Sequence, residues 1–172
     1  MIGLIGYGHV GTNGVKLLQP FGCRILVCDP YVPPSAEDAA QGVEKVMFDD
    51  LLRASDVVSL HARVTAGTTG FIAAREFSLM KDGAYFINTA RGPMVNDDDL
   101  YLALTRGKLR GASLETFAIE PSPADWPLLK LPSVTFTPHI AGASINTVKH
   151  AAAMVAEEVR RFIAREAFLN PC

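Results

Sequence analysis

The chain has 172 residues, a length that suits one compact domain with a sizeable hydrophobic core. Its 16 basic and 18 acidic residues give a formal charge of −2, and 49% of its residues are hydrophobic. The sequence has no basic stripe of the kind that binds a nucleic-acid backbone, and no apolar run approaches the ~18 residues that cross a bilayer. We therefore expect neither nucleic acid nor a membrane as a partner.

The cysteines set an expectation about the cellular compartment. Cys23, Cys28 and Cys172 are odd in number and lack the spacing of metal ligands. Two of them fall within or beside a predicted strand, which favours buried or incidental thiols. We therefore expect no metal site and a reducing cytoplasm.

Short apolar runs rich in β-branched residues alternate with helix-like stretches along the chain. Runs of this length without polar alternation are typical of parallel strands covered on both faces. The alternation predicts an α/β fold: a doubly wound, mostly parallel sheet with helices on both faces. In chain order, the predicted strands are MIGLI, RILVC, VVSL, AYFIN, GASLE and VTFT, and the predicted helices are residues 10–18, 48–54, 73–80, 97–106 and 144–165.

A glycine-rich turn follows the first predicted strand. Gly6, Gly8 and Gly11 form a G-x-G-x-x-G pattern where the strand leads into the first predicted helix. In dinucleotide-binding folds the first glycine permits a tight turn, the second lets a pyrophosphate approach the backbone, and the third lets helix and strand pack closely. Glycine-rich turns also occur at ordinary strand–helix junctions, so this pattern alone leaves a purely structural role open.

Asp29 ends the second predicted strand, about twenty residues after the glycines. A carboxylate at this point can accept hydrogen bonds from the adenosine ribose, and it repels a 2′-phosphate, so it favours NAD over NADP. Taken alone, Asp29 before Pro30 is better explained as a turn residue.

Polar side chains follow nearly every predicted strand. Because ligands of open α/β sheets bind beyond the carboxyl ends of the strands, we expect these side chains to converge on one edge. They comprise one arginine, two glutamates and two histidines, which suffice for acid–base chemistry on an anionic substrate. The set is residues 6–11, Asp29, His61, residues 88–91, residues 115–120 and His139.

Three features have structural interpretations. Asn96 is a good cap for the fourth predicted helix, and the carboxylates after it suit the positive helix end. Trp126 is most simply a packing anchor. The last predicted helix carries one apolar stripe, with Glu157 and Arg161 one turn apart on its outer side; the stripe consists of Val148, Ala152, Val155, Val159 and Phe162.

The order and spacing of six segments carry a family resemblance. The segments are GLIGYGHVG, CDPY, ASDVVSLHARVTAGTTGFI, LMKDGAYFINTARGPMVNDDDL, GKLRGASLETFAIEP and LPSVTFTPHIAGAS. Through them, almost the whole chain resembles the nucleotide-binding domain of the D-isomer-specific 2-hydroxyacid dehydrogenases. The resemblance implies a Rossmann-type domain that uses NAD to transfer a hydride between nicotinamide and a D-2-hydroxy or 2-oxo acid.

The resemblance implies a catalytic trio of Arg91, Glu120 and His139. Reduction of a 2-oxo acid needs a hydride, a proton and a cation that holds the carboxylate. His139 can supply the proton, Glu120 can favour its imidazolium form, and Arg91 can hold the carboxylate through its planar guanidinium. Singly, each residue has a plainer explanation as a loop cation, a solvated loop acid or a helix-entry residue. Together, at predicted strand ends, they favour catalysis.

The resemblance also implies which residues contact the cofactor. Among them, His61 is expected on the cofactor side rather than in catalysis, and His9 in the glycine loop. The full set is Gly6, Gly8, His9, Val10, Gly11, Asp29, Pro30, His61, Ala62, Thr69, Thr89, Ala90, Arg91, Glu115, His139 and Gly142.

Two residues depart from the family pattern. Glu115 stands where most members carry an aspartate near the nicotinamide, and its extra methylene shifts the charge by roughly an ångström. Arg63 stands where the family often has proline, which changes the stiffness of the loop and adds a cation.

Family enzymes pair this domain with a substrate domain, which we expect this sequence not to include. We therefore expect residues 1–172 to form a single NAD-binding domain, incomplete for catalysis alone, that dimerises with a second copy. Two alternatives remain: an NAD-sensing binding module, as family-related corepressors are, and another Rossmann-type enzyme such as a methyltransferase that uses S-adenosylmethionine. The catalytic trio counts against the first, and the segments NTARG and TPHIAG count against the second.

Overall fold

The computed structural model describes residues 1–32 and 36–169. It divides into two compact units, Met1–Pro138 and a second unit that begins at His139. The first unit contains the whole sheet. The second consists of one long helix and its flanking segments, and each unit is described by itself.

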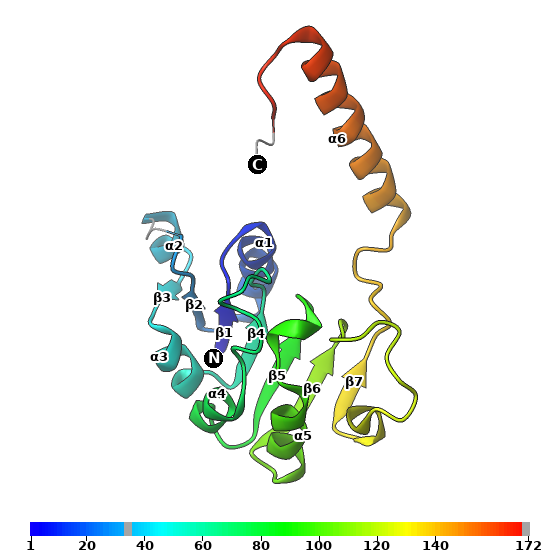
Figure 1. Ribbon diagram of the computed structural model, residues 1–172. Helices are drawn as coiled ribbons and strands as arrows, with labels where there is room; N and C mark the ends of the chain where they lie inside the picture. The colour runs from blue at the N-terminus through cyan, green and yellow to red at the C-terminus, as the bar shows by residue number, and fades with distance from the viewer. Residues whose placement is uncertain (33–35, 170–172) are drawn as a thin grey trace. The chain divides into compact units, whose positions relative to one another are not determined.

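The first unit is built on a seven-stranded sheet in the order β3-β2-β1-β4-β5-β6-β7, and every neighbouring pair is parallel (Figure 1). The predicted fold class is thus confirmed, with one further strand, β3, that the sequence did not predict. The strands are β1 (Ile2–Ile5), β2 (Ile25–Cys28), β3 (Val43–Lys45), β4 (Val57–Leu60), β5 (Ala84–Asn88), β6 (Leu109–Leu114) and β7 (Val134–Phe136).

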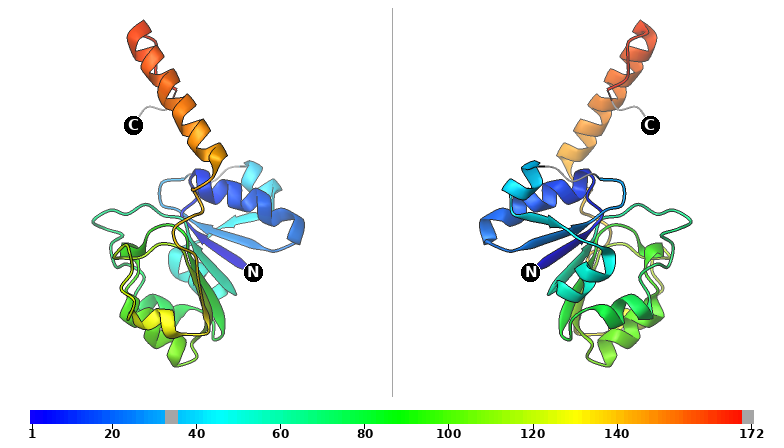
Figure 2. Two further views of the ribbon diagram at one scale, coloured as in Figure 1. Left: turned by 90° about the vertical axis from the view of Figure 1, so that its right-hand side faces the viewer. Right: turned by 90° about the vertical axis from the view of Figure 1, so that its left-hand side faces the viewer.

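Helices cover both faces of this sheet (Figures 1 and 2). The α1 and α2 helices lie on one face, and α3, α4 and α5 lie on the other, because connections between parallel strands cross over with a single hand. The bounds are α1 (His9–Leu18), α2 (Ala36–Ala40), α3 (Phe48–Ala54), α4 (Ala74–Leu79) and α5 (Asp97–Thr105), with short 3₁₀ turns at η1 (Gln19–Phe21), η2 (Gly92–Met94) and η3 (Pro127–Lys130).

Two hydrophobic clusters form the core of the first unit. Successive strand residues point to opposite faces, so Leu4 belongs to a smaller cluster with Val15 of α1, whereas Ile5 belongs to a larger cluster beneath α3, α4 and α5. In the larger cluster the rings of Phe77 and Phe86 meet edge to face at 5.5 Å. The sheet is therefore buried on both faces around β1 and β2, as the apolar strands predict, whereas the face of β5 that carries Tyr85 is partly exposed.

The two structural roles predicted for the first unit are confirmed. The side chain of Asn96 accepts a hydrogen bond of 3.1 Å from the backbone N–H of Asp99 and caps α5. Trp126 packs edge to face on Phe117 at 5.4 Å and lies 5.9 Å from the ring of Phe136. These aromatic contacts anchor the proline-rich loop after β6.

The second unit contains α6 (Ile145–Ala164), which has no buried residue. Ser144 caps it, and Arg161 pairs with Glu157 at 2.8 Å, as the spacing predicts. The apolar stripe, however, stays exposed: Val148 is 67% exposed and Phe162 70%. Among the described residues, no helix combines the length and the apolar character that a membrane span requires.

Candidate functional site

The sheet brings the predicted polar residues of the first unit to one edge. Its strands end in register, because the last residues of β1, β2, β4, β5, β6 and β7 are paired in an unbroken row. The residue that follows each of these strands therefore emerges at the same carboxyl edge. Gly6, Asp29, His61, Thr89 and Glu115 follow β1, β2, β4, β5 and β6 in this way, and Thr137 follows β7.

The three glycines of the first turn serve three different purposes. Gly6 has a φ of +96°, and a Cβ there would lie 2.7 Å from the backbone N of Ala62. A Cβ on Gly11 would collide with the carbonyl oxygen of Gly6, so this glycine permits close packing of helix and strand. Gly8 faces open space, with no atom near its missing Cβ. The turn thus has room at the point where a pyrophosphate would approach.

The first turn of α1 is open to an anion. The helix begins at His9, which is a helical residue rather than the loop residue that the sequence predicted. Its N-cap, Gly8, provides no capping side chain, and the first turn contains no acidic residue. The first N–H groups of the helix therefore remain available, together with the positive end of the helix dipole.

Backbone hydrogen bonds fix the carboxylate of Asp29. Its Oδ2 accepts from the N–H of Tyr7 at 2.8 Å, and its Oδ1 accepts from the N–H of Tyr31 at 2.8 Å. The second bond is the turn contact that the plainer explanation predicts, and the first ties β2 to the glycine turn. Each oxygen keeps a further lone pair, so a half-buried, oriented carboxylate beside exposed Pro30 fits the ribose of a dinucleotide.

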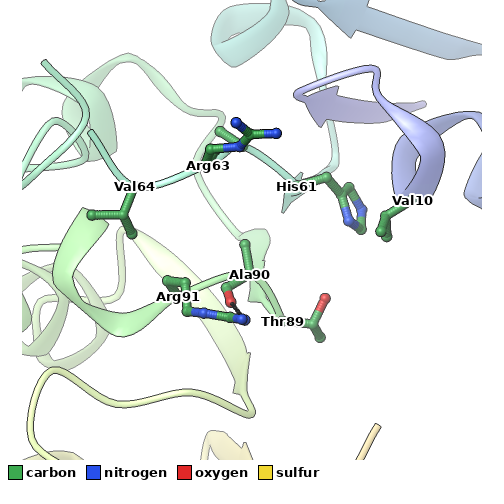
Figure 3. Close-up of a pocket in the computed structure, with 8 residues that line it drawn as sticks. Val10, His61, Arg63, Val64, Thr89, Ala90 and Arg91 are labelled. Carbon is green, nitrogen blue, oxygen red and sulfur yellow. Dashed lines mark hydrogen bonds between the residues drawn. The ribbon is translucent and has the colours of Figure 1, made fainter. Parts of the chain in front are cut away.

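A cavity of about 520 Å³ opens at the same edge, between the segments that follow β4 and β5 (Figure 3). Two arginines line it, and none of its eight lining residues is acidic. Six of the eight belong to the predicted cofactor contacts, and Arg63 and Val64 are additional. The lining comprises Val10, His61, Ala62, Arg63, Val64, Thr89, Ala90 and Arg91.

Asn88 shapes the segment that carries Arg91. Its buried side chain accepts from the N–H of Ala90 at 3.0 Å and donates to the carbonyl of Arg91 at 3.1 Å. Arg91 itself donates to the carbonyl of Ala90 at 2.6 Å, and its exposed guanidinium lies along the cavity toward Thr89 (Figure 3). Asn88 belongs to the polar residues expected at this edge, although no catalytic or cofactor-binding role was predicted for it.

Close packing sets the segment of Arg91 against the segment of Glu120. A Cβ on Gly92 would collide with the backbone of Phe117 and Ala118, so only glycine fits between these two segments. Glu120 in turn accepts from the N–H of Phe117 at 3.0 Å. Two members of the predicted trio therefore stand on neighbouring loops.

Burial favours the neutral form of His61. Its Nε2 lies 3.0 Å from the hydroxyl of Ser59, and burial lowers the pKa of its imidazole below the ordinary 6.5. An uncharged ring suits a wall of the cavity better than an acid–base role. His61 lines the cavity, and its cofactor-side role stays a prediction.

The remaining predicted contacts have different surroundings. Glu115 is buried at the end of β6, next to Thr116, whose buried hydroxyl has no hydrogen-bond partner within the described part of the chain. Thr69 is exposed, does not line the cavity, and donates to the carbonyl of Thr65 at 2.9 Å.

His139 and Gly142 belong to the second unit. His139 is exposed and has a φ of 53°, a left-handed conformation that histidine adopts more often than most residues other than glycine. Over residues 1–32 and 36–169, no cluster of three or more His, Cys, Asp or Glu side chains could hold a metal ion.

A parallel α/β sheet with a glycine turn, an oriented strand-end carboxylate and a cationic cavity at its carboxyl edge defines a dinucleotide-binding domain. Comparison with known proteins identifies the family. The model of the D-isomer specific 2-hydroxyacid dehydrogenase, NAD binding domain, matches residues 1–141. The chain belongs to this family, which confirms NAD as the cofactor class and excludes the methyltransferase alternative.

Individual relatives agree with this assignment. The chain is 40% identical to the glyoxylate reductase of Korarchaeum cryptofilum over 161 residues. This aligned region covers 94% of this chain and 48% of that protein. The D-mandelate dehydrogenase structure from Rhodotorula graminis superposes with a TM-score of 0.93 at 31% identity, over 99% of this chain and 50% of that one.

A third relative was solved with its cofactor. The NAD-complexed D-isomer specific 2-hydroxyacid dehydrogenase from Lactobacillus delbrueckii ssp. bulgaricus gives a TM-score of 0.88 at 29% identity, over 98% of this chain and 56% of that one. The chain spans half or less of the length of the curated relatives it matches.

Proposed function

We propose that this protein binds NAD at the carboxyl edge of its sheet and acts in the interconversion of a D-2-hydroxy acid and a 2-oxo acid. One observation carries the proposal: the register of the strands brings the glycine turn, the fixed carboxylate of Asp29 and the cavity of Arg91 to one edge. Family membership supports the same chemistry.

The residues present fit a dinucleotide. The open backbone at Gly8 and the uncapped start of α1 would hold the pyrophosphate, and Asp29 would accept from the ribose hydroxyls. A carboxylate at this position would repel a 2′-phosphate, so we propose a preference for NAD over NADP. When bound, the nicotinamide supplies or accepts the hydride.

The chain's own residues would then bind the substrate and move its proton. Arg91, with its guanidinium exposed in the cavity, would hold the substrate carboxylate through a bidentate contact. His139 would give a proton to the nascent alkoxide in reduction and remove it in oxidation. Glu120 would favour the protonated form of that histidine. We expect His139→Ala to slow turnover of 2-oxo acids with NADH by ~10² to 10⁴; near-normal turnover would contradict the role of His139.

Calorimetric titration of the chain with NADH and NADPH tests cofactor binding. We expect NADH to bind and NADPH to bind far more weakly. Asp29→Ala should weaken NADH binding by about 10- to 100-fold, because two charge-assisted hydrogen bonds to the ribose are lost. Asp82→Ala is the matched control, since it removes a carboxylate that pairs with Lys108 instead.

Two results would contradict the proposal. Failure of the native chain to bind NADH would show that the carboxyl edge of the sheet is not a cofactor site. Equal binding of NADH and NADPH, unaffected by Asp29→Ala, would show that Asp29 does not contact the ribose. The assignment of the glycine turn to the pyrophosphate would still stand. Circular dichroism of each variant distinguishes a lost site from a lost fold.

We also propose that the protein forms a homodimer and resides in a reducing cytoplasm. Cys23 and Cys28 are free thiols, which supports a reducing compartment. Large exposed apolar side chains support association. Sedimentation equilibrium over a range of concentrations tests the dimer, and a monomer at every concentration would contradict it.

A further inference from the structure

Arg63 is a second cation in the cavity of Arg91 (Figure 3). The Arg91 side chain extends toward Thr89, and the Arg63 side chain runs back along its own segment in the direction of His61 (Figure 3). No lining residue is acidic, and within the described residues the guanidinium of Arg63 makes no hydrogen bond or ion pair. By contrast, Arg53 and Arg75 of the same unit are both paired with carboxylates. The charge of Arg63 is thus available to a ligand.

The backbone around Arg63 is well fixed. Its carbonyl accepts from the hydroxyl of Thr68 at 2.7 Å, and the same Thr68 oxygen accepts from the N–H of Thr65 at 2.7 Å. The N–H groups of Thr68 and Thr69 both donate to the carbonyl of Thr65 at 3.1 Å. These bonds close a compact turn directly after Arg63, so the residue is held at the rim of the cavity although its side chain is exposed.

Two separate guanidinium groups suit a ligand with two separate anionic groups. Each planar guanidinium can bind one carboxylate or phosphate in a bidentate manner. His61 adds no positive charge at pH 7, because burial lowers the pKa of its ring. The positive charge of the cavity lining therefore comes from Arg63 and Arg91 alone.

We propose that Arg63 determines substrate specificity, and that the preferred substrate is a 2-hydroxy or 2-oxo acid with a second, distal acidic group. Arg91 would hold the carboxylate next to the reacting carbon, and Arg63 would hold the distal carboxylate or phosphate. This inference rests on the proposed function. A role toward the cofactor's 2′-phosphate is disfavoured, because that group would lie near Asp29 at the end of β2, and β1 separates β2 from β4.

Binding of matched acids to the NAD⁺-saturated chain tests the inference. With NAD⁺ and a 2-oxo acid no hydride can be transferred, so calorimetry measures affinity alone. The probes are 2-oxoglutarate and 2-oxopentanoate, which share five carbons and differ in the distal carboxylate, and 3-phosphohydroxypyruvate and hydroxypyruvate, which differ in the phosphate. We expect at least one dianion to bind about 10- to 100-fold more tightly than its matched monoanion.

Variants test whether Arg63 causes the preference for a dianion over its matched monoanion. Arg63→Ala should abolish it, Arg63→Lys should retain part of it, and Arg106→Ala, which removes an exposed arginine at the end of α5, should leave it intact. The inference is overturned if neither dianion is preferred, if the preference survives in Arg63→Ala, or if no acid binds to the NAD⁺ complex. It is also overturned if Arg63→Ala mainly weakens NAD⁺ binding, because Arg63 would then serve the pyrophosphate. Failure of NAD⁺ to bind the native chain appears in the first titration and counts against the proposed function itself.

Discussion

The two units of this chain are stabilised in different ways. Residues 1–138 enclose two clusters of buried side chains on the faces of a parallel sheet. In the second unit, α6 buries no residue and depends on its cap and on pairs such as Glu157 with Arg160. A 20-residue helix without tertiary packing is only marginally stable in water. The comparison teaches that an apolar stripe in a sequence identifies a helix face that can be buried, without identifying what buries it.

Truncation of a phenylalanine in each unit should give the largest difference in stability between the two units. Phe86 is fully buried, so Phe86→Ala should lower the free energy of unfolding by about 3–5 kcal/mol through lost burial and a residual cavity. Phe162→Ala on α6 removes a side chain that is 70% exposed and should change stability by less than ~0.5 kcal/mol. Urea denaturation followed by tryptophan fluorescence measures both, and equal effects would contradict the difference in packing.

Substitution of a glycine in each unit should give the next largest difference. A Cβ on Gly92 would enter the backbone of Phe117 and Ala118, so Gly92→Ala should destabilise the first unit by about 2–3 kcal/mol. Gly142 in the second unit has open space around its missing Cβ. Gly142→Ala should therefore shift the melting temperature very little. A well-tolerated Gly92→Ala would show that the two loops can separate.

The two units should respond to pH in opposite directions. Burial first, and then the neighbouring Asp98, raise the pKa of Asp97 to about 6 from its ordinary 3.8. The folded state thus binds a proton more tightly than the unfolded state, and this group lowers the free energy of unfolding as pH rises from about 4 to 6. Because Asp97 is only partly buried, we expect about 1–2 kcal/mol rather than the full value of the shift. Asp97→Asn should remove this pH-dependent fall in the free energy of unfolding, because the amide does not ionise. Its oxygen still provides an acceptor for the indole of Trp126.

Glu157 of α6 provides the opposite case. Arg160 first, and then Arg161, lower its pKa to about 2 from the ordinary 4.5. Its contribution to the helix is therefore fully present above pH 4.5 and is lost as pH falls toward 2. Far-ultraviolet circular dichroism of native and Glu157→Gln chains between pH 2 and 7 measures this. A helical signal in the native chain with the same acid dependence as in Glu157→Gln would contradict it.

Removal of the α6 cap should have a small effect that is confined to the second unit. The side chain of Ser144 accepts from the N–H of Thr147 at 3.0 Å, so Ser144→Ala should cost α6 about 1 kcal/mol. Hydrogen exchange should show faster exchange at the start of α6 and unchanged protection in β1 and β4. Faster exchange throughout the first unit, or protection of α6 equal to that of the sheet, would contradict the independence of the two units.

Most of the fold follows from the sequence because buried parallel strands are continuous apolar runs. The exception, β3 (Val43–Lys45), has one buried apolar residue followed by Glu44 and Lys45, so no hydrophobic pattern distinguishes it from a loop. Its pairing with β2 is a tertiary property. The short α2 was missed for a similar reason, since five residues contain too little periodicity to identify a helix.

The candidate site was predicted where the chemistry is local and missed where it depends on neighbours. His61 directly follows β4, and Arg91 comes shortly after β5, so the sheet topology brings both to the cavity. The contribution of Arg63 depends on the turn that Thr68 closes, and that of Asn88 on hydrogen bonds within its own loop. His9 was expected in a loop because the sequence does not mark the residue at which Gly8 ends and α1 begins.

The all-parallel sheet also has a kinetic consequence. No neighbouring strands can be joined by a hairpin, so each pairing must wait for an intervening crossover segment to form. The inner strand β1 completes its pairing only when β4, more than fifty residues later, arrives beside it. Formation of such distant pairs takes milliseconds to seconds, whereas the local hydrogen bonds of α6 form in about a microsecond. During refolding, α6 should therefore gain helical structure well before the edge that carries Asp29 and Arg91 exists.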